Sequence, residues 1–157
     1  MSNVTITRTF DAPPAKLFAA WTQPAEIARW YGPSQFRTPA ERITVDLRPG
    51  GRWELTMVRR DGTGEFSIGY EIIEVQPPSL LVMRSDPMPN MPEPTVVRVE
   101  IATNGNGAIL TLTDGPLPLD GAAGAEAGYN AALDKLAEAL SAGDRSRGTS
   151  AGSTAAR

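Results

Sequence analysis

The fold of this chain is decided by two short blocks, ARWYGP at residues 28–33 and LRPGGRW at residues 47–53. Each block joins an aromatic side chain to glycine and proline, so each places a large apolar anchor beside a bend of the backbone. The blocks are separated by 13 residues. We expect the first block to close a short helix over 25–31 and the second to form the turn between strands over 42–47 and 52–60.

Hydrophobic periodicity predicts which segments of the rest of the chain are strands and which are helices. β-branched and aromatic residues alternate with polar ones in several segments, which is typical of half-buried strands. The predicted strands span residues 4–10, 42–47, 52–60, 65–76, 80–84, 95–101 and 108–113. Apolar residues at helical spacing predict helices over 15–21, 25–31 and 121–142.

The order of these elements predicts one α+β domain over residues 1–142. Consecutive strands joined by tight turns run antiparallel, and such a sheet has one apolar face to bury. The only long amphipathic helix in the pattern is 121–142, where Tyr129, Leu133 and Leu136 recur at helical spacing. A helix-grip fold follows, in which a curved antiparallel sheet wraps around the C-terminal helix and two short helices follow the first strand. Residues 143–157 have no aliphatic side chain larger than Ala and are predicted to form a disordered polar tail.

The composition excludes several kinds of chemistry. The chain has no Cys and no His, so thiolate nucleophiles, disulfides, Ser-His-Asp triads and His-bound zinc are excluded. Acid-base chemistry would fall to Asp, Glu, Lys, Tyr or ordered water. No loop clusters acidic residues in the manner of a hard-cation site, so no metal or organic cofactor is expected.

The net charge and the hydropathy of the chain restrict the classes of partner that we expect. The formal net charge is −3, and the densest basic pair, Arg59 and Arg60, adjoins Asp61, so a nucleic-acid interface is not expected. No apolar run approaches the roughly 18 residues of a membrane span. The first residues show neither a basic region nor an apolar stretch, so no secretory signal is expected and the predicted location is the cytoplasm.

Several segments carry a family resemblance. They are TFDAP (9–13), AWT (20–22), RWYGP (29–33), DLRPGGRW (46–53), EVQPP (74–78), LTLT (110–113), GY (128–129) and LDKL (133–136). Together they resemble the START-like (SRPBCC, Bet v 1-like) superfamily and, within it, the family of the C-terminal domain of the activator of heat-shock-protein-90 ATPase. The resemblance covers about residues 4–141. It implies a helix-grip fold with a cavity between sheet and helix, and it implies no shared catalytic residue.

The chain departs from the family pattern at two positions. The family often has Trp where this chain has Tyr31 and Tyr129, so the resemblance implies hydroxyl groups at two otherwise apolar sites. The eukaryotic co-chaperone of this family carries an additional N-terminal domain that is not found in this sequence. A chaperone partner is therefore not expected from the family name.

The candidate ligand-binding residues are those expected to face the cavity. They are Trp30, Tyr31, Trp53, Leu55, Met57, Glu71, Ile73, Val97, Val99, Tyr129 and Leu133. For the two Trp residues, the alternative is that they serve only as core anchors. For the two Tyr residues, the alternative is packing with a satisfied hydroxyl group.

Glu71 is the carboxylate singled out by alternation. If the inner face of the strand over 65–76 is that of Ile73 and Val75, Glu71 also points inward, where burial would raise its pKa and suit it to ligand binding or acid-base work. The alternatives are a shift of register, or an ion pair with Arg52 or Arg98.

Three functions remain open from the sequence. The first is binding of a small, largely apolar ligand in the cavity between sheet and C-terminal helix. The second is a cyclase or hydratase type of enzyme with Glu71 as acid-base. The third is a protein-interaction domain that resembles the co-chaperone. The sequence leaves homodimerisation open.

Overall fold

The computed structural model describes residues 1–88 and 93–156, with side chains described up to residue 141. Its elements, in chain order, are β1 (Ser2–Phe10), α1 (Pro14–Thr22), α2 (Pro24–Ile27), β2 (Phe36–Arg37), η1 (Ala40–Arg42), β3 (Ile43–Val45), β4 (Arg52–Arg59), β5 (Glu65–Gln76), β6 (Leu80–Ser85), β7 (Val96–Asn104), β8 (Gly107–Leu117) and α3 (Leu119–Ala156). The predicted order is confirmed, and β2 is an additional short strand.

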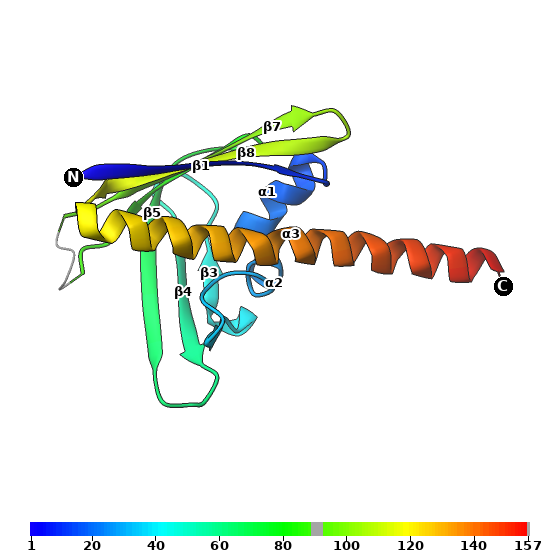
Figure 1. Cartoon of the computed structure of the whole chain (residues 1–157), viewed down its shortest axis with the longest axis horizontal. Coiled ribbons are helices and arrows are strands. Elements are labelled where there is room, and N and C mark those ends of the chain that lie inside the picture. The colour runs from blue at the N-terminus through cyan, green and yellow to red at the C-terminus, as the bar shows by residue number, and fades with distance from the viewer. Residues whose placement is uncertain (89–92, 157) are drawn as a thin grey trace.

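All eight strands form one antiparallel sheet, in the order β1-β8-β7-β6-β5-β4-β2, with β3 also paired to β4. The long helix α3 crosses the sheet, and α1 and α2 lie toward one end (Figure 1). The predicted α+β helix-grip fold is confirmed.

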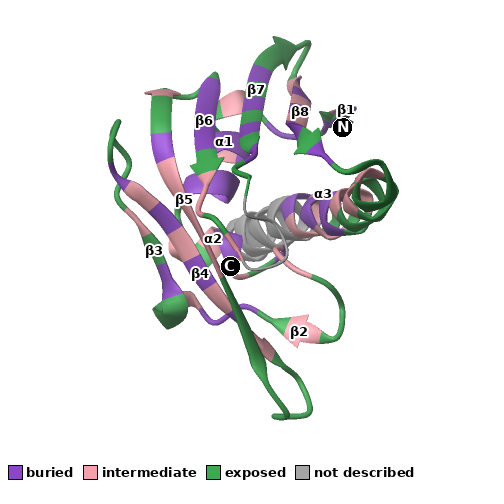
Figure 2. Ribbon diagram, turned by 90° about the vertical axis from the view of Figure 1, so that its left-hand side faces the viewer, coloured by how far each residue is buried: buried purple, intermediate pink, exposed green. Residues whose placement is uncertain are grey.

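The core lies between the concave face of the sheet and α3. Alternation decides which strand residues reach it: in β4, Trp53, Leu55 and Met57 are buried, and their neighbours are not. Helix α3 contributes Leu133 and Leu136 to the same core, since these residues repeat on one helical face. Figure 2 shows the buried residues of the strands and of α3 along this interior.

The blocks at residues 28–33 and 47–53 meet in the core through their aromatic rings. Trp30 and Tyr31 come from the first block and Trp53 from the second, and the Tyr31 and Trp53 ring centroids are 5.3 Å apart in an edge-to-face arrangement. Both indoles are satisfied: Trp30 Nε1 donates to the carbonyl oxygen of Ala20 at 2.9 Å, and Trp53 Nε1 donates to that of Trp21 at 2.8 Å. These hydrogen bonds join α1 to both blocks.

Glycine at position 32 is required where the first block turns back. Its φ is +99°, and a Cβ there would lie 2.9 Å from the sulfur of Met57, so a larger residue is disfavoured both by conformation and by space. The carbonyl oxygen of Gly32 accepts a hydrogen bond from Lys135 Nζ of α3. The turn is thereby tied to the helix that covers the sheet.

A bulge in β5 overturns the expected direction of Glu71. The register between β5 and β6 shifts between Ile72 and Glu74, so one extra residue is inserted at Ile73. Ile72 is fully buried, while Ile73 is 39% exposed. The alternation expected from Val75 backward is therefore wrong beyond the bulge, and Glu71 and Ile73 point out of the core. Glu71 Oε1 instead accepts a hydrogen bond from Arg84 Nη2 at 2.8 Å. Glu71 thus forms an ion pair, but its partner is neither Arg52 nor Arg98, the two arginines named from the sequence.

Helix α3 begins two residues before the predicted start and ends at Ala156, well beyond the predicted end at residue 142. No residue between 119 and 128 is buried, whereas buried residues recur from Ala132 onward. The predicted polar tail, 143–157, falls outside the residues whose side chains the structure describes.

Candidate functional site

All three tyrosines of the chain converge on one buried carboxylate. Tyr31 follows α2, Tyr70 lies on β5, Tyr129 lies on α3, and each of them is close enough to Asp114 of β8 for the carboxylate to influence the pKa of its hydroxyl group. Four segments that are distant in the sequence thus bring four polar groups together on the concave side of the sheet. We call these four residues the tyrosine–aspartate cluster.

The strand pairing explains why Asp114 points inward. Asp114 lies opposite Val97 on β7 and Val4 on β1, and both of these partners are buried in the core. Cross-strand partners share one face of a sheet, so the carboxylate also points inward. It is only 7% exposed.

The carboxylate of Asp114 is partly satisfied by its neighbours. Tyr129 Oη donates to Oδ2 at 2.7 Å. Oδ1 is shielded from solvent and has no hydrogen bond of ordinary geometry, although Thr95 and the backbone of Gly115 lie close enough to favour the charged form. Burial is the larger effect and raises the pKa of the Asp114 carboxyl, while these three donors act in the opposite direction.

The tyrosine hydroxyl groups remain neutral donors at physiological pH. Burial raises the pKa of Tyr70 to about 12. It also raises the pKa values of Tyr31 and Tyr129 well above their ordinary value, and the negative charge of Asp114 adds to both effects. The Tyr31 and Tyr70 hydroxyls lie close enough to influence each other's pKa. The cluster can therefore donate hydrogen bonds and, through Asp114, accept one.

A second pair of hydroxyl groups extends the polar region toward the end of the sheet. The backbone N–H of Thr95 donates to Ser85 Oγ at 2.8 Å, and Thr95 itself is 4% exposed. Ser85 lies opposite Tyr70 in the sheet, on the same face. The inner surface is thus polar at this end and apolar at the other.

The residues of the cluster are surrounded by protein yet retain accessible surface. Tyr31, Tyr70 and Tyr129 each sit deep among neighbouring atoms, and each is nonetheless partly exposed rather than buried. This combination is typical of side chains that line a concave surface.

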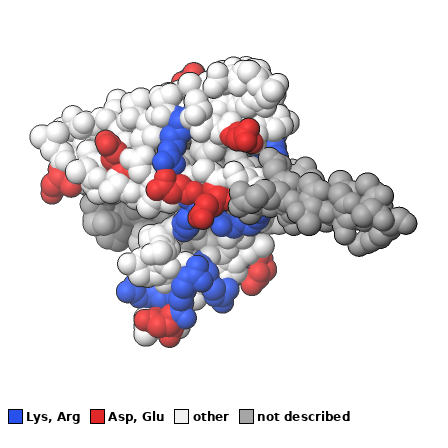
Figure 3. Space-filling view, turned by 45° about the vertical axis from the view of Figure 1, so that its right-hand side comes forward, with Lys and Arg blue, Asp and Glu red and all other residues white. Residues whose placement is uncertain are grey.

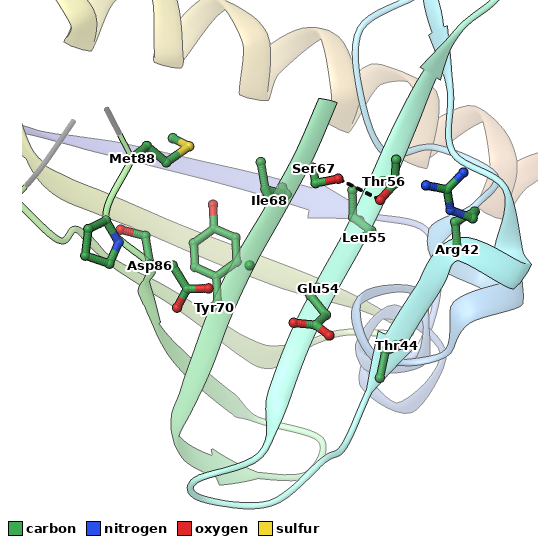
Figure 4. A pocket seen from close by; sticks show the side chains of 13 residues that line it. Arg42, Thr44, Glu54, Leu55, Thr56, Ser67, Ile68, Tyr70, Asp86 and Met88 are labelled. Atoms are coloured by element: carbon green, nitrogen blue, oxygen red, sulfur yellow. Dashed lines mark hydrogen bonds between the residues drawn. The ribbon is translucent and has the colours of Figure 1, made fainter. Parts of the chain in front are cut away.

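A groove of about 460 Å³ lies mostly over the outer face of β4 and β5, where Thr44, Glu54 and Gly69 line it, and it borders the cluster at Tyr70. Figure 4 shows Tyr70 and Ile68 on β5, Glu54 on β4, and Asp86 and Met88 beyond the end of β6. A second hollow of about 370 Å³ lies over the outer face of β6, β7 and β8, away from the tyrosines.

An ion-pair group on the outer face flanks this groove. Arg52 Nη1 donates to Asp86 Oδ1 at 3.0 Å, and Arg52 Nε donates to Glu54 Oε2 at 3.2 Å. The pair lies across Gly69, where a Cβ would come within 2.6 Å of both Arg52 and Asp86. The Arg52 guanidinium lowers the pKa of Asp86. Exposed groups that are paired in this way are typical of surface structure.

The candidates predicted from the sequence separate into three groups. Tyr31 and Tyr129 belong to the tyrosine–aspartate cluster. The buried core holds Trp30, Trp53, Leu55, Met57, Val97, Val99 and Leu133. Glu71 and Ile73 lie on the other side of the sheet, so the role expected for Glu71 inside the cavity is not supported.

The sequence analysis missed Tyr70, Asp114 and Thr95. The alternation that turns Glu71 inward places its neighbour Tyr70 on the outer face, and this alternation fails at the bulge at Ile73. Asp114 lies just beyond the predicted end of the last strand at 113, whereas β8 continues to Leu117. Alternation through Leu110 and Leu112 would have placed Asp114 on the inner face, so the signal was present but was cut off by the predicted boundary.

On the face shown in Figure 3, the Lys and Arg side chains of the described residues lie next to Asp and Glu side chains. Among the residues that the structure describes, no group of three or more acidic side chains could hold a metal ion. In the same part of the chain, no helix is long and apolar enough to cross a membrane.

Comparison with known proteins agrees with the fold. The AHSA1 protein from Silicibacter pomeroyi superposes with a TM-score of 0.76 at 24% identity, covering 89% of this chain and 98% of that one. The AHSA1-like protein from Aeromonas hydrophila gives a TM-score of 0.79 at 24% identity, covering 91% of this chain and 94% of that one. No curated protein matches the sequence significantly. Residues 11–141 match the family described as Activator of Hsp90 ATPase homolog 1-like protein, so the chain belongs to that family, within the START-like superfamily.

Proposed function

We propose that this protein binds a small, largely apolar molecule on the concave side of its sheet, with the tyrosine–aspartate cluster holding the polar end of that molecule. The START-like fold commonly binds hydrophobic ligands. The observation that carries the proposal is the convergence of Tyr31, Tyr70 and Tyr129 on the buried Asp114. A ligand site of this kind is mostly apolar, with a few polar groups that fix the orientation.

The chemistry of the walls supports an amphiphilic ligand. Trp53 packs against both Tyr31 and Tyr70, with ring centroids 5.3 and 5.6 Å apart, so the polar hydroxyls are attached to a continuous aromatic surface. An apolar ligand body gains from burial against such rings. The hydroxyls and the carboxylate then select for a polar group at one end.

The first turns of α3 are the proposed route of entry. The segment 119–128 consists largely of Gly and Ala, and the side chains it packs against the core are the small, partly buried ones of Ala122 and Ala125. A shift of this segment would therefore expose little apolar surface. A ligand could therefore reach the cluster without separating Leu133 and Leu136 from the core.

The test combines native mass spectrometry of the purified protein with a thermal-shift screen of amphiphilic compounds. A co-purified mass, or a rise in melting temperature that grows with compound concentration, is the expected result. The Tyr129→Phe variant should bind the compound more weakly. The control is Thr7→Val, which removes a hydroxyl group from an exposed position of β1. Equal affinity in Tyr129→Phe and Thr7→Val would contradict the proposed site.

The other two functions are outcomes of the same experiments. No observation now favours an enzyme based on Glu71, because that side chain points away from the cluster. A chaperone complex that forms equally well with wild type and Tyr129→Phe, together with no compound bound, would favour the protein-interaction function instead.

A further inference from the structure

Many carboxylates of the described residues form ion pairs, but Asp114 has no cationic partner among them. The ion pairs described for residues 1–88 and 93–141 involve Asp46, Glu54, Asp86 and other carboxylates that are all substantially exposed. None of these pairs includes Asp114, although Asp114 is the one Asp or Glu buried among the described residues. The least solvated carboxylate among the described residues thus has no counter-ion in any of these pairs.

Such an arrangement is unfavourable unless something completes it. A buried carboxylate is costly without a cation or a full set of hydrogen bonds. Tyr129 supplies one bond to Oδ2, and Oδ1 has none of ordinary geometry. The raised pKa of the Asp114 carboxyl has the same physical origin. What the site lacks is a positively charged hydrogen-bond donor directed at Oδ1.

The aromatic groups around Asp114 suit the same kind of donor. Tyr31, Tyr70 and Tyr129 lie within electrostatic reach of the carboxylate, and Trp53 packs edge-to-face against the first two. The faces of aromatic rings carry partial negative charge and attract ammonium groups. An anionic ligand would meet both these rings and the carboxylate unfavourably, and a neutral alcohol would gain only a hydrogen bond.

We infer that the molecule bound at the tyrosine–aspartate cluster is an amphiphilic amine, whose protonated ammonium group donates to Asp114 Oδ1 while its apolar body lies against the aromatic wall. This inference rests on the proposed function and deepens it. It names the class of ligand and assigns Asp114 as the residue that determines specificity.

The experiment compares three probes that share one apolar body: 4-phenylbutylamine, 4-phenyl-1-butanol and 4-phenylbutyrate. Isothermal titration calorimetry at neutral pH measures their affinities for the wild-type protein. We expect the amine to bind at least about tenfold more tightly than the alcohol, since a charge-assisted bond to a buried carboxylate exceeds a neutral one by about that factor. The carboxylate probe should bind most weakly.

The Asp114→Asn variant tests the assignment of the residue. Asparagine keeps the shape and can still accept from Tyr129, but it removes the charge, so the amine should lose its advantage and bind no better than the alcohol. The matched control is Asp46→Asn, which removes a carboxylate from an exposed ion pair with Arg48. That control should keep the preference for the amine.

The outcomes distinguish a failure of the inferred ligand class from a failure of the proposed binding function. Equal binding of amine and alcohol to the wild type, or tightest binding of the butyrate, would overturn the ligand class and leave the proposed site standing. An amine preference that persists in Asp114→Asn would overturn the role of Asp114. Absence of binding for all three probes would count against the proposed function itself. If Asp114→Asn does not fold, the ranking of the probes on wild type still decides the ligand class.

Discussion

The two parts of α3 perform different tasks. From Ala132 onward the helix buries Leu133, Leu136 and Leu140 in the core, and it is this part that holds the sheet in its curved form. From 119 to 128 it carries mostly Gly and Ala, packs only the partly buried Ala122 and Ala125 against the core, and is followed directly by Tyr129 of the tyrosine–aspartate cluster. The residues of α3 that stabilise the core therefore lie about one turn beyond the segment that borders the candidate site.

The largest expected effect is on stability and comes from the packed part of the helix. Leu133→Ala removes a fully buried side chain and leaves a cavity, so the free energy of unfolding should fall by about 2–5 kcal/mol. Leu119→Ala is the matched control, because Leu119 is 73% exposed and its truncation should change stability by less than about 0.5 kcal/mol. Urea unfolding followed by circular dichroism measures both. Similar losses in the two variants would contradict the division of α3.

The second largest effect on stability is expected in the tyrosine–aspartate cluster. Tyr129→Phe removes the donor to Asp114 Oδ2 and leaves a buried carboxylate less satisfied, so we expect a loss of about 1–3 kcal/mol together with weaker ligand binding. Chemical unfolding and calorimetry of the same preparation measure the two effects. A loss of stability without any change in binding would assign Tyr129 to packing alone.

Asp114→Asn, unlike the two variants above, should increase the free energy of unfolding at neutral pH. Because burial raises the folded-state pKa of Asp114, the folded protein takes up a proton more readily than the unfolded chain. The stabilising contribution of the neutral form is therefore complete below the unfolded pKa and is lost as the pH rises through the folded pKa.

Removing the charge should accordingly stabilise the ligand-free protein by about 1–2 kcal/mol at pH 7, and the advantage should disappear in acid. The groups that face Asp114 from α3, β5 and the segment after α2 are Tyr129, Tyr70 and Tyr31, whose raised pKa values keep them neutral throughout this range. Melting temperatures of both proteins between pH 4 and 8 test this. A difference that does not depend on pH would contradict an effect of the carboxylate charge.

The smallest effect is expected on the outer face. Glu71→Gln breaks an exposed ion pair with Arg84 and should change stability by no more than about 0.5 kcal/mol. Probe binding should be unaffected, because the side chain points away from the cluster. A substantial loss of binding in this variant would revive the inward role that alternation first predicted for Glu71.

The fold was predictable because its signals are local. In β4 the alternation is uninterrupted, so Trp53, Leu55 and Met57 could be assigned to the core from the sequence, and the leucines of α3 follow a plain helical period. The two aromatic blocks also predicted the bends correctly, and the rings of both blocks meet in the core.

The site was only partly predictable because it depends on register and on contacts between distant segments. One inserted residue at Ile73 exchanges the faces of Tyr70 and Glu71, and the sequence does not mark the bulge except by two adjacent isoleucines. Tyr31 and Tyr129 were identified individually. Their approach to Asp114 depends on how α3 crosses the sheet, which no local pattern determines.

Hydrogen–deuterium exchange with and without a bound probe tests the central claim most directly, using whichever phenylbutyl compound binds most tightly. We predict that the probe slows exchange in peptides from 119–128 and in those that contain Tyr31 and Tyr70, because these segments border the tyrosine–aspartate cluster. Peptides from the hairpin that joins β7 to β8, residues 102–109, should be unchanged, because this end of the sheet is distant from Asp114. Protection confined to that hairpin, with none near Tyr70 or in the first turns of α3, would contradict the account.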